Sequence, residues 1–202
     1  MYKVQGEIKG LVAMMHNRFF EPEATEPGGK RTKSPEDRIR EIELKLHMDA
    51  KRSRVIIPAD NLRMMLIGNT ARPGAAKILG TFIETGKGTK YIEAATSSIW
   101  VLGTKDPLRC EILPTRKTFD EIDERPFNTQ KGKGGMSRKI QHRPLIKCPW
   151  KVPFIVHVTD DNLSSNWVRD LFKLAGLRCG LGAYGPTFGR FEVTRWRVEK
   201  KQ

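Results

Sequence analysis

The sequence lacks a long apolar run, a cysteine framework and a cluster of metal ligands. None of its apolar stretches approaches the length of a membrane span, and the N-terminal residues lack the apolar core of a signal peptide. Its three cysteines are far apart and form no C-x-x-C pair, so the sequence supports neither a disulfide framework nor a zinc site. Its four histidines are scattered. We therefore expect a soluble cytoplasmic protein with reduced thiols and with neither a metal nor a cofactor.

Acidic residues are few relative to basic ones. The chain has 37 Lys and Arg against 23 Asp and Glu, which gives a net charge of +14. Such an excess is typical of proteins with a polyanionic partner, although a solvated basic surface is the alternative explanation. The length of 202 residues, of which 38% are hydrophobic, fits one domain with long insertions around a real core.

The most unusual stretch is residues 175–193, where five of nineteen residues are glycine. A helical pattern over 162–175 precedes it, and a strand over 188–198 follows it. We predict that the helix begins at Asp160, Asp161 or Asn162 and that it stops at Gly176. A backbone without Cβ atoms can approach a ligand closely and turn its N–H groups toward an anion.

Within this stretch Gly180, Gly182 and Gly185 match the dinucleotide-binding pattern G-x-G-x-x-G. That site needs a strand before the glycines and a helix after them, so that the pyrophosphate meets a helix N-terminus. Here the order is reversed, and Pro186 follows at once. We therefore reject a dinucleotide site, and a structural turn without a ligand is the plain alternative.

The rest of the chain divides into predicted strands, helices and loops. Pro58 and Asp60 favour the start of a helix that Gly68 ends, with Leu62, Met65 and Leu66 facing the core. Alternating or apolar patterns predict strands over residues 2–15, 38–48, 54–57, 91–102 and 151–159, a second helix over 73–84 and a long loop over 17–38.

The core pattern disappears between residues 104 and 143. Prolines interrupt this segment, and residues 130–139 are basic and rich in glycine, without apolar periodicity. No helix or strand face explains the clustering of Lys131, Lys133, Arg138 and Lys139. We interpret the segment as an excursion from the domain. The order of the remaining elements predicts an α+β fold with a ferredoxin-like (RRM-like) βαββαβ core and long insertions.

The glycine-rich stretch before the last strand resembles the signature of the RAMP superfamily of CRISPR-associated proteins. The helix entry Ile57 to Leu62 is similar to that of the superfamily's backbone subunits, although Ala59 and Asp60 replace the usual glycine and serine. The resemblance covers about half of the chain. It implies a single domain with a palm (residues 1–103 and 144–202) and a β-hairpin thumb (residues 104–143). It also implies several copies along a guide RNA, with other CRISPR-associated subunits, in antiviral defence.

Single-stranded RNA is held by Lys and Arg beside its phosphates and by aromatic side chains under its bases. Phe188 could supply stacking, but it is as well suited to the core. Nine residues are the candidate RNA contacts: Lys131, Lys133, Arg138, Lys139, Arg178, Gly180, Gly182, Tyr184 and Arg190.

Two alternatives remain open. Some relatives in the superfamily are endoribonucleases that process guide RNA, for which His16 would be the candidate acid or base. Others cleave target RNA with an aspartate after the first strand, but no residue between Glu21 and Asp37 matches by position, so we assign no catalytic residue. The second alternative is a viral mimic that binds and inhibits a host complex.

Overall fold

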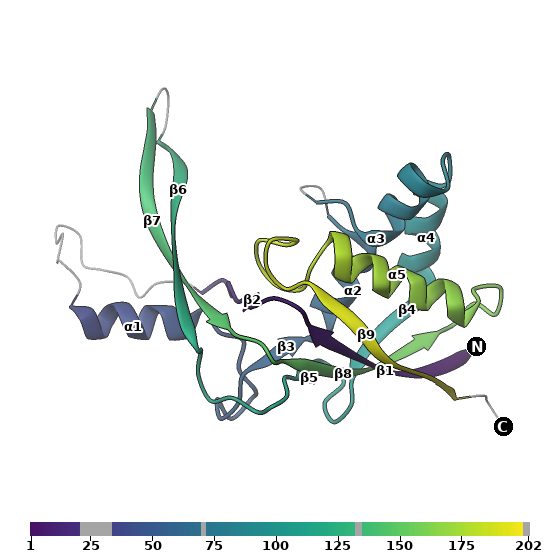
Figure 1. Cartoon of the computed structure of the whole chain (residues 1–202), viewed down its shortest axis with the longest axis horizontal. Helices are drawn as coiled ribbons and strands as arrows, with labels where there is room; N and C mark the ends of the chain where they lie inside the picture. Colours follow the sequence, from purple (N-terminus) through teal and green to yellow (C-terminus); the bar gives the residue numbers. More distant parts are fainter. Residues whose placement is uncertain (21–33, 70–71, 132–134, 200–202) are drawn as a thin grey trace.

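The computed structural model of the chain describes the backbone of residues 1–20, 34–69, 72–131 and 135–199, and their side chains except those of 127–139. A four-stranded antiparallel sheet organises the fold (Figure 1). Its strands are β1 (Tyr2–Gly10), β4 (Ile99–Gly103), β8 (Lys151–Val158) and β9 (Phe191–Glu199), in the order β4-β8-β1-β9.

Helices cover one face of this sheet (Figure 1). They are α2 (Ala59–Ile67), α3 (Ala75–Ile78), its continuation in the π-helix η1 (Leu79–Ile83), α4 (Gly88–Ser98) and α5 (Ser165–Arg178). Alternate residues of β1 and β8 are fully buried beneath the helices, as strand geometry requires. Phe154 of β8 stacks on Phe172 of α5, with 4.9 Å between the ring centroids. The other residues of these strands form the outer face of the sheet.

A long β-hairpin projects away from the sheet (Figure 1). It consists of β6 (Glu121–Lys131) and β7 (Gly135–Ile146), paired from Glu121↔Leu145 to Lys131↔Gly135. The base of β7 also pairs with β2 (Met14–Met15), the short strand that follows β1. The hairpin is therefore joined to the body through the segment that leaves the first strand of the sheet.

The α+β class predicted from the sequence is confirmed, and so are several elements. Helix α2 ends at Gly68, which has a φ of 81°, and Leu62, Met65 and Leu66 are buried. The strand predicted over 2–15 is interrupted, because Leu11 turns away and donates its N–H to the carbonyl of Arg190.

The strand predicted over 38–48 is wrong, because this region belongs mainly to helix α1 (Pro35–Leu44). Ser34 and Asp37 form a reciprocal capping box, and Pro35 occupies the first helical position. These start signals outweigh the alternation of apolar residues on which the prediction depended. The strand predicted over 91–102 is wrong in its first part, since α4 runs to Ser98 and β4 begins only at Ile99.

The predicted ends of α5 also need correction. The N-cap is Ser164, whose hydroxyl accepts a hydrogen bond from the N–H of Trp167. Gly176 lies inside the helix, where a Cβ atom would approach the carbonyl oxygen of Phe191 to 2.3 Å. This glycine therefore permits close packing of α5 on β9, and the helix continues to Arg178.

The core extends into the segment after β4. Strand β5 (Arg109–Glu111) pairs with β3 (Ile56–Pro58), and Cys110 and Ile112 are buried in the hydrophobic core. The part of residues 104–143 that projects is therefore the hairpin from Glu121 onward.

Candidate functional site

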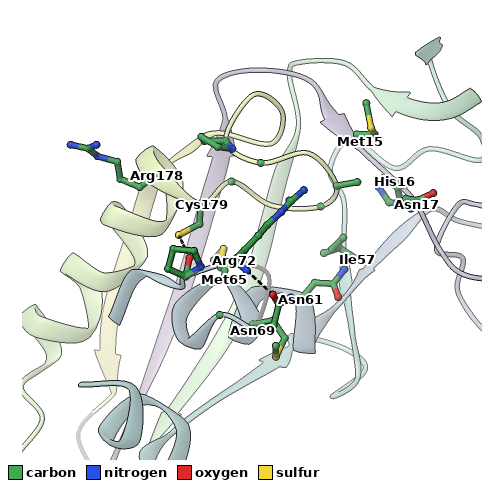
Figure 2. A pocket seen from close by; sticks show the side chains of 18 of the residues that line it. Met15, His16, Asn17, Ile57, Asn61, Met65, Asn69, Arg72, Arg178 and Cys179 are labelled. Atoms are coloured by element: carbon green, nitrogen blue, oxygen red, sulfur yellow. Dashed lines mark hydrogen bonds between the residues drawn. The ribbon is translucent and has the colours of Figure 1, made fainter. Parts of the chain in front are cut away.

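A cleft of about 530 Å³ lies beside the glycine-rich loop (residues 179–190), which joins α5 to β9. Three segments form its walls (Figure 2): this loop, the segment that follows β2, and α2 with the turn after it. The cleft is lined by Met15, His16, Asn17, Arg18, Phe19, His47, Ile57, Asn61, Met64, Met65, Gly68, Asn69, Arg72, Pro73, Ile78, Arg178, Cys179, Gly180, Gly182, Ala183, Gly185 and Pro186.

The glycine-rich loop forms one wall of the cleft. Its backbone takes conformations that favour glycine. Gly180, Gly182 and Gly189 have φ values of 72°, 87° and 72°. A Cβ atom on Gly182 would lie 2.4 Å from the carbonyl oxygen of Met15, and the N–H of Ala183 donates to that oxygen at 2.9 Å. The loop is thus fixed against β2, as close as a backbone without side chains allows.

The opposite wall is the turn that follows α2. The backbone N–H of Arg72 donates to the side-chain oxygen of Asn69 at 2.8 Å, and the N–H of Asn69 donates to the carbonyl of Arg72 at 2.9 Å. The thiol of Cys179 donates to the carbonyl of Pro73 at 3.8 Å, and burial raises the pKa of this thiol to about 11. Cys179 therefore stays a thiol and connects the two walls at one end of the cleft.

The cleft is apolar in its depth and charged at its rim. Met15, Ile57 and Met65 are buried. Arg18, Arg72 and Arg178 are exposed. Figure 2 shows Arg72 extending across the cleft toward the glycine-rich loop, while Arg178 points away from it.

The charge in the cleft is of one sign. No Asp or Glu is among the described residues that line it. Arg18, Arg72 and Arg178 form no ion pair within the described part of the chain. A local positive potential without an internal counter-charge is suited to an anionic ligand.

Two histidines line the inner part of the cleft. His16 is only 1% exposed, and burial, with a smaller contribution from His47, lowers its pKa to about 3. Burial and then the charge of Arg18 lower the pKa of His47 to about 4. Both rings are therefore neutral at pH 7, so they can form hydrogen bonds but do not carry the proton that a general acid needs.

The other side of the glycine-rich loop contacts the base of the hairpin. The guanidinium of Arg143 lies 4.5 Å from the ring centroid of Tyr184, and that of Arg125 lies 4.7 Å from the ring centroid of Phe188. Cation–π contacts of this kind hold the hairpin against the loop. Tyr184 has a positive φ of 56°, which is uncommon for a residue with a side chain.

Arg143 differs from Arg125 in its surroundings. The guanidinium of Arg125 is paired with Asp123 at 2.8 Å. Arg143 is only 3% exposed, and its Nε and Nη1 atoms have no hydrogen-bond partner among the described residues. Its Nη2 donates to the side-chain oxygen of Gln141. A buried cation without a carboxylate partner is costly to keep in a folded protein.

The structure brings together some of the predicted contact residues but not all of them. Arg178, Gly180 and Gly182 line the cleft, whereas Tyr184 lies on the hairpin side of the same loop. Arg190 is exposed and does not line the cleft. Lys131, Arg138 and Lys139 lie on the two strands of the hairpin, but their side chains, and all of Lys133, are outside the described residues.

Sequence reasoning missed Arg18, Asn61, Arg72 and Arg143 as functional candidates. They come from four separate segments, and only Asn61 belongs to a motif that the sequence analysis identified, the helix entry Ile57 to Leu62. Their proximity to the glycine-rich loop depends on tertiary pairing, above all on the contact between Met15 and Ala183.

Two further properties of the described residues bear on the site. They contain no group of three or more His, Cys, Asp or Glu side chains placed to hold a metal ion. None of the helices within them has the length and apolarity needed to cross a membrane.

Comparison with known proteins finds distant structural similarity but no match in sequence. No family model matches the sequence, and no curated protein matches it. A chain in the cryo-EM structure of the Type III-B Cmr-beta complex bound to cognate target RNA is similar, with 12% sequence identity and a TM-score of 0.47. The match covers 98% of this chain and 61% of that chain. A similarity this weak assigns neither a partner nor an activity to this protein.

Proposed function

We propose that this protein binds single-stranded RNA in the cleft and along the base of the hairpin. The observation that carries the proposal is the cleft itself, which has three unpaired arginines and no carboxylate among the described residues that line it. An RNA strand supplies one negative charge per nucleotide, so it would provide the counter-charges that the protein does not.

Aromatic side chains near the cleft support a strand rather than a small anion. Phe19 lies at the rim and is 85% exposed, and Tyr184 is half-buried on the far side of the glycine-rich loop. Exposed aromatic rings beside basic residues are the usual means of holding unpaired bases.

We further infer that the chain is a backbone subunit of a CRISPR-type ribonucleoprotein, with several copies along a guide RNA. The order β4-β8-β1-β9, with helices between β1 and β4 and between β8 and β9, supports a ferredoxin-like palm. The projecting hairpin supports a thumb within residues 104–143, between palm segments 1–103 and 144–202. Such a projection would reach a neighbouring copy on the same strand.

The test is RNA binding by a triple variant, R18A/R72A/R178A, measured by fluorescence anisotropy at several salt concentrations. The matched control, K90A/K173A/R197A, removes the same charge from exposed sites outside the cleft. Each phosphate contact contributes about 0.7 to the slope of log affinity against log salt, so the cleft variant should lower the slope by about 2 if all three arginines make one contact.

Equal losses of RNA affinity in the cleft variant and in the control would contradict the proposal, because they would show a general effect of net charge. Mass photometry of the wild-type protein on RNAs of graded length tests the proposed copies. The number of bound copies should rise with RNA length, and a single copy at every length would contradict the backbone-subunit role.

A further inference from the structure

We propose that the cleft receives the base of one nucleotide of the bound strand, and that His16 and Asn61 hydrogen-bond to the edge of that base. The inference rests on the proposed function and adds a binding subsite to it. It predicts that the protein recognises bases as well as phosphates.

The first observation is the change in character from rim to floor. A ligand that needed only phosphate contacts would be satisfied at the rim by Arg18 and Arg72. The buried side chains of Met15, Ile57 and Met65 below them offer nothing to a phosphate, but they can pack against an apolar heterocycle. A nucleotide has this same division, with a flat ring at one end and an anionic group at the other.

The second observation is an unsatisfied hydrogen-bond donor on His16, a buried residue that lines the cleft. The Nδ1 atom of His16 accepts a hydrogen bond from the N–H of His47 at 3.4 Å. Because the ring is neutral, its proton is on Nε2, and this buried atom has no partner within the described residues. Buried polar groups are normally hydrogen-bonded, so this donor indicates an acceptor that the protein itself does not supply.

The third observation is the side-chain amide of Asn61. It lines the cleft from the first turn of α2, is half-buried, and has no hydrogen bond within the part of the chain that the structure describes. An amide offers one acceptor and two donors. Together with the donor on His16 it matches the mixed donors and acceptors along the edge of a base.

The dimensions also fit. A volume of about 530 Å³ is within the range of pockets that enclose small organic ligands. In Figure 2 Asn61 lies on the α2 side of the cleft and Arg72 extends across it, so a nucleotide whose base contacted Asn61 would place its phosphate toward the guanidinium. A nucleotide in this position would contact the floor, the α2 wall and the rim together.

The experiment compares two strands of equal length and charge, oligouridylate and an abasic ribose-phosphate strand. Wild-type protein should bind oligouridylate about tenfold more tightly, which is the value of one good hydrogen bond to a buried group. Asn61→Ala should remove most of that preference, and His16→Ala should do the same if it folds. Arg72→Ala should weaken binding of both strands equally and keep the preference.

Asn162→Ala is the control, because Asn162 is exposed in the turn before α5 and does not line the cleft. It should bind both strands as wild type does. A preference that Asn61→Ala leaves unchanged would overturn the inference, and so would equal binding of the two strands by wild type. Failure to bind either strand would instead overturn the proposed function.

A competition experiment distinguishes binding of an RNA strand from binding of a free nucleotide. Uridine monophosphate alone should compete only weakly with oligouridylate, because it lacks the neighbouring phosphates that the rim and hairpin would contact. Competition by the mononucleotide at the same concentration as the strand would overturn the assignment to RNA and identify the cleft as a site for a free nucleotide.

Discussion

The cleft and the outer face of the central sheet both carry several charged side chains, but they differ in how far these charges form ion pairs. On the outer face the carboxylate of Glu7 lies 3.7 Å from Lys151 and 3.7 Å from Arg195, and it accepts a hydrogen bond from Thr194 at 2.9 Å. Neighbouring cross-strand pairs join Lys3 to Glu199 and Lys9 to Glu192. In the cleft, by contrast, three arginines have no carboxylate partner among the described residues.

This difference shows why net charge alone cannot locate a binding surface. The +14 excess is a property of the whole chain, yet Lys3, Lys9, Lys151 and Arg195 on the outer face each lie beside a carboxylate. A strand that bound there would have to displace those acids or meet their repulsion. Unpaired cations beside a glycine-rich wall are therefore the better indication of where a polyanion binds.

The largest expected effect comes from closing the cleft at its glycine wall. Gly182→Val adds a branched side chain at a φ of 87° and 2.4 Å from a carbonyl oxygen, so it should destabilise the fold by about 3 kcal/mol and abolish RNA binding. Gly86→Val is the matched control, because Gly86 has a φ of 83° but nothing within 4 Å of a Cβ atom.

Thermal unfolding and anisotropy on both variants separate backbone strain from close approach. Gly86→Val should unfold at a lower temperature and still bind RNA. If Gly182→Val binds RNA as the parent protein does, the loop is only a spacer. The proposal that RNA binds in the cleft rather than on the outer face would then be contradicted.

Sequence reasoning found the glycine-rich wall of the cleft and Arg178 but not the other two arginines, for a physical reason. Glycine density and the pattern of α5 and β9 are local, and so is the Pro58-to-Gly68 helix, and these were predicted. Arg18 and Arg72 reach the cleft only because β2 pairs with the glycine-rich loop and α2 ends at Gly68. Nothing local marks them, since one follows a two-residue strand and the other lies in a turn.

The mistaken strands have a related cause. Ile39, Ile42, Leu44 and Leu46 include an alternating run, but Ser34 and Asp37 form the cap of a helix. Apolar periodicity over so short a segment does not separate a helix from a strand, whereas a capping box fixes where a helix begins. Boundaries are therefore predicted best where a residue such as Gly68 or Pro58 has a stereochemical reason to be there.

A smaller effect on the free energy of unfolding is expected at acidic pH. It tests whether water reaches His16 in the cleft. Burial lowers the pKa of His16 from 6.5 to about 3, so below pH 6.5 the unfolded chain binds a proton that the folded protein does not. The free energy of unfolding should therefore fall as the pH falls through this window, by about 2 kcal/mol for this residue between pH 7 and pH 5.

Chemical denaturation of the wild type and of His16→Gln at several pH values measures this contribution. The variant should lose less stability on acidification than the wild type does. RNA binding by the wild type should be constant between pH 7 and pH 8, since the His16 ring stays neutral there. An identical acid response in both proteins would show that the floor of the cleft is hydrated and that His16 titrates normally.

The smallest effect is expected from replacing one arginine beside the glycine-rich loop and one on the outer face of the sheet. Arg143→Met removes a buried guanidinium that has no carboxylate partner, so it should raise the free energy of unfolding by about 1 kcal/mol, even after the loss of its contact with Tyr184. Arg195→Met on the outer face removes an exposed partner of Glu7, so it should change stability by less than about 1 kcal/mol.

The two variants should also differ in their affinity for RNA. Arg143 is held at the hairpin base beside the glycine-rich loop, where a bound strand would supply the missing negative charge, so Arg143→Met should be more stable and bind more weakly. Arg195→Met should bind as the wild type does. Urea denaturation and anisotropy on the same preparations decide between the two surfaces. If Arg195→Met loses affinity and Arg143→Met does not, RNA follows the outer face of the sheet, and the unpaired arginine at the hairpin base has only a structural role.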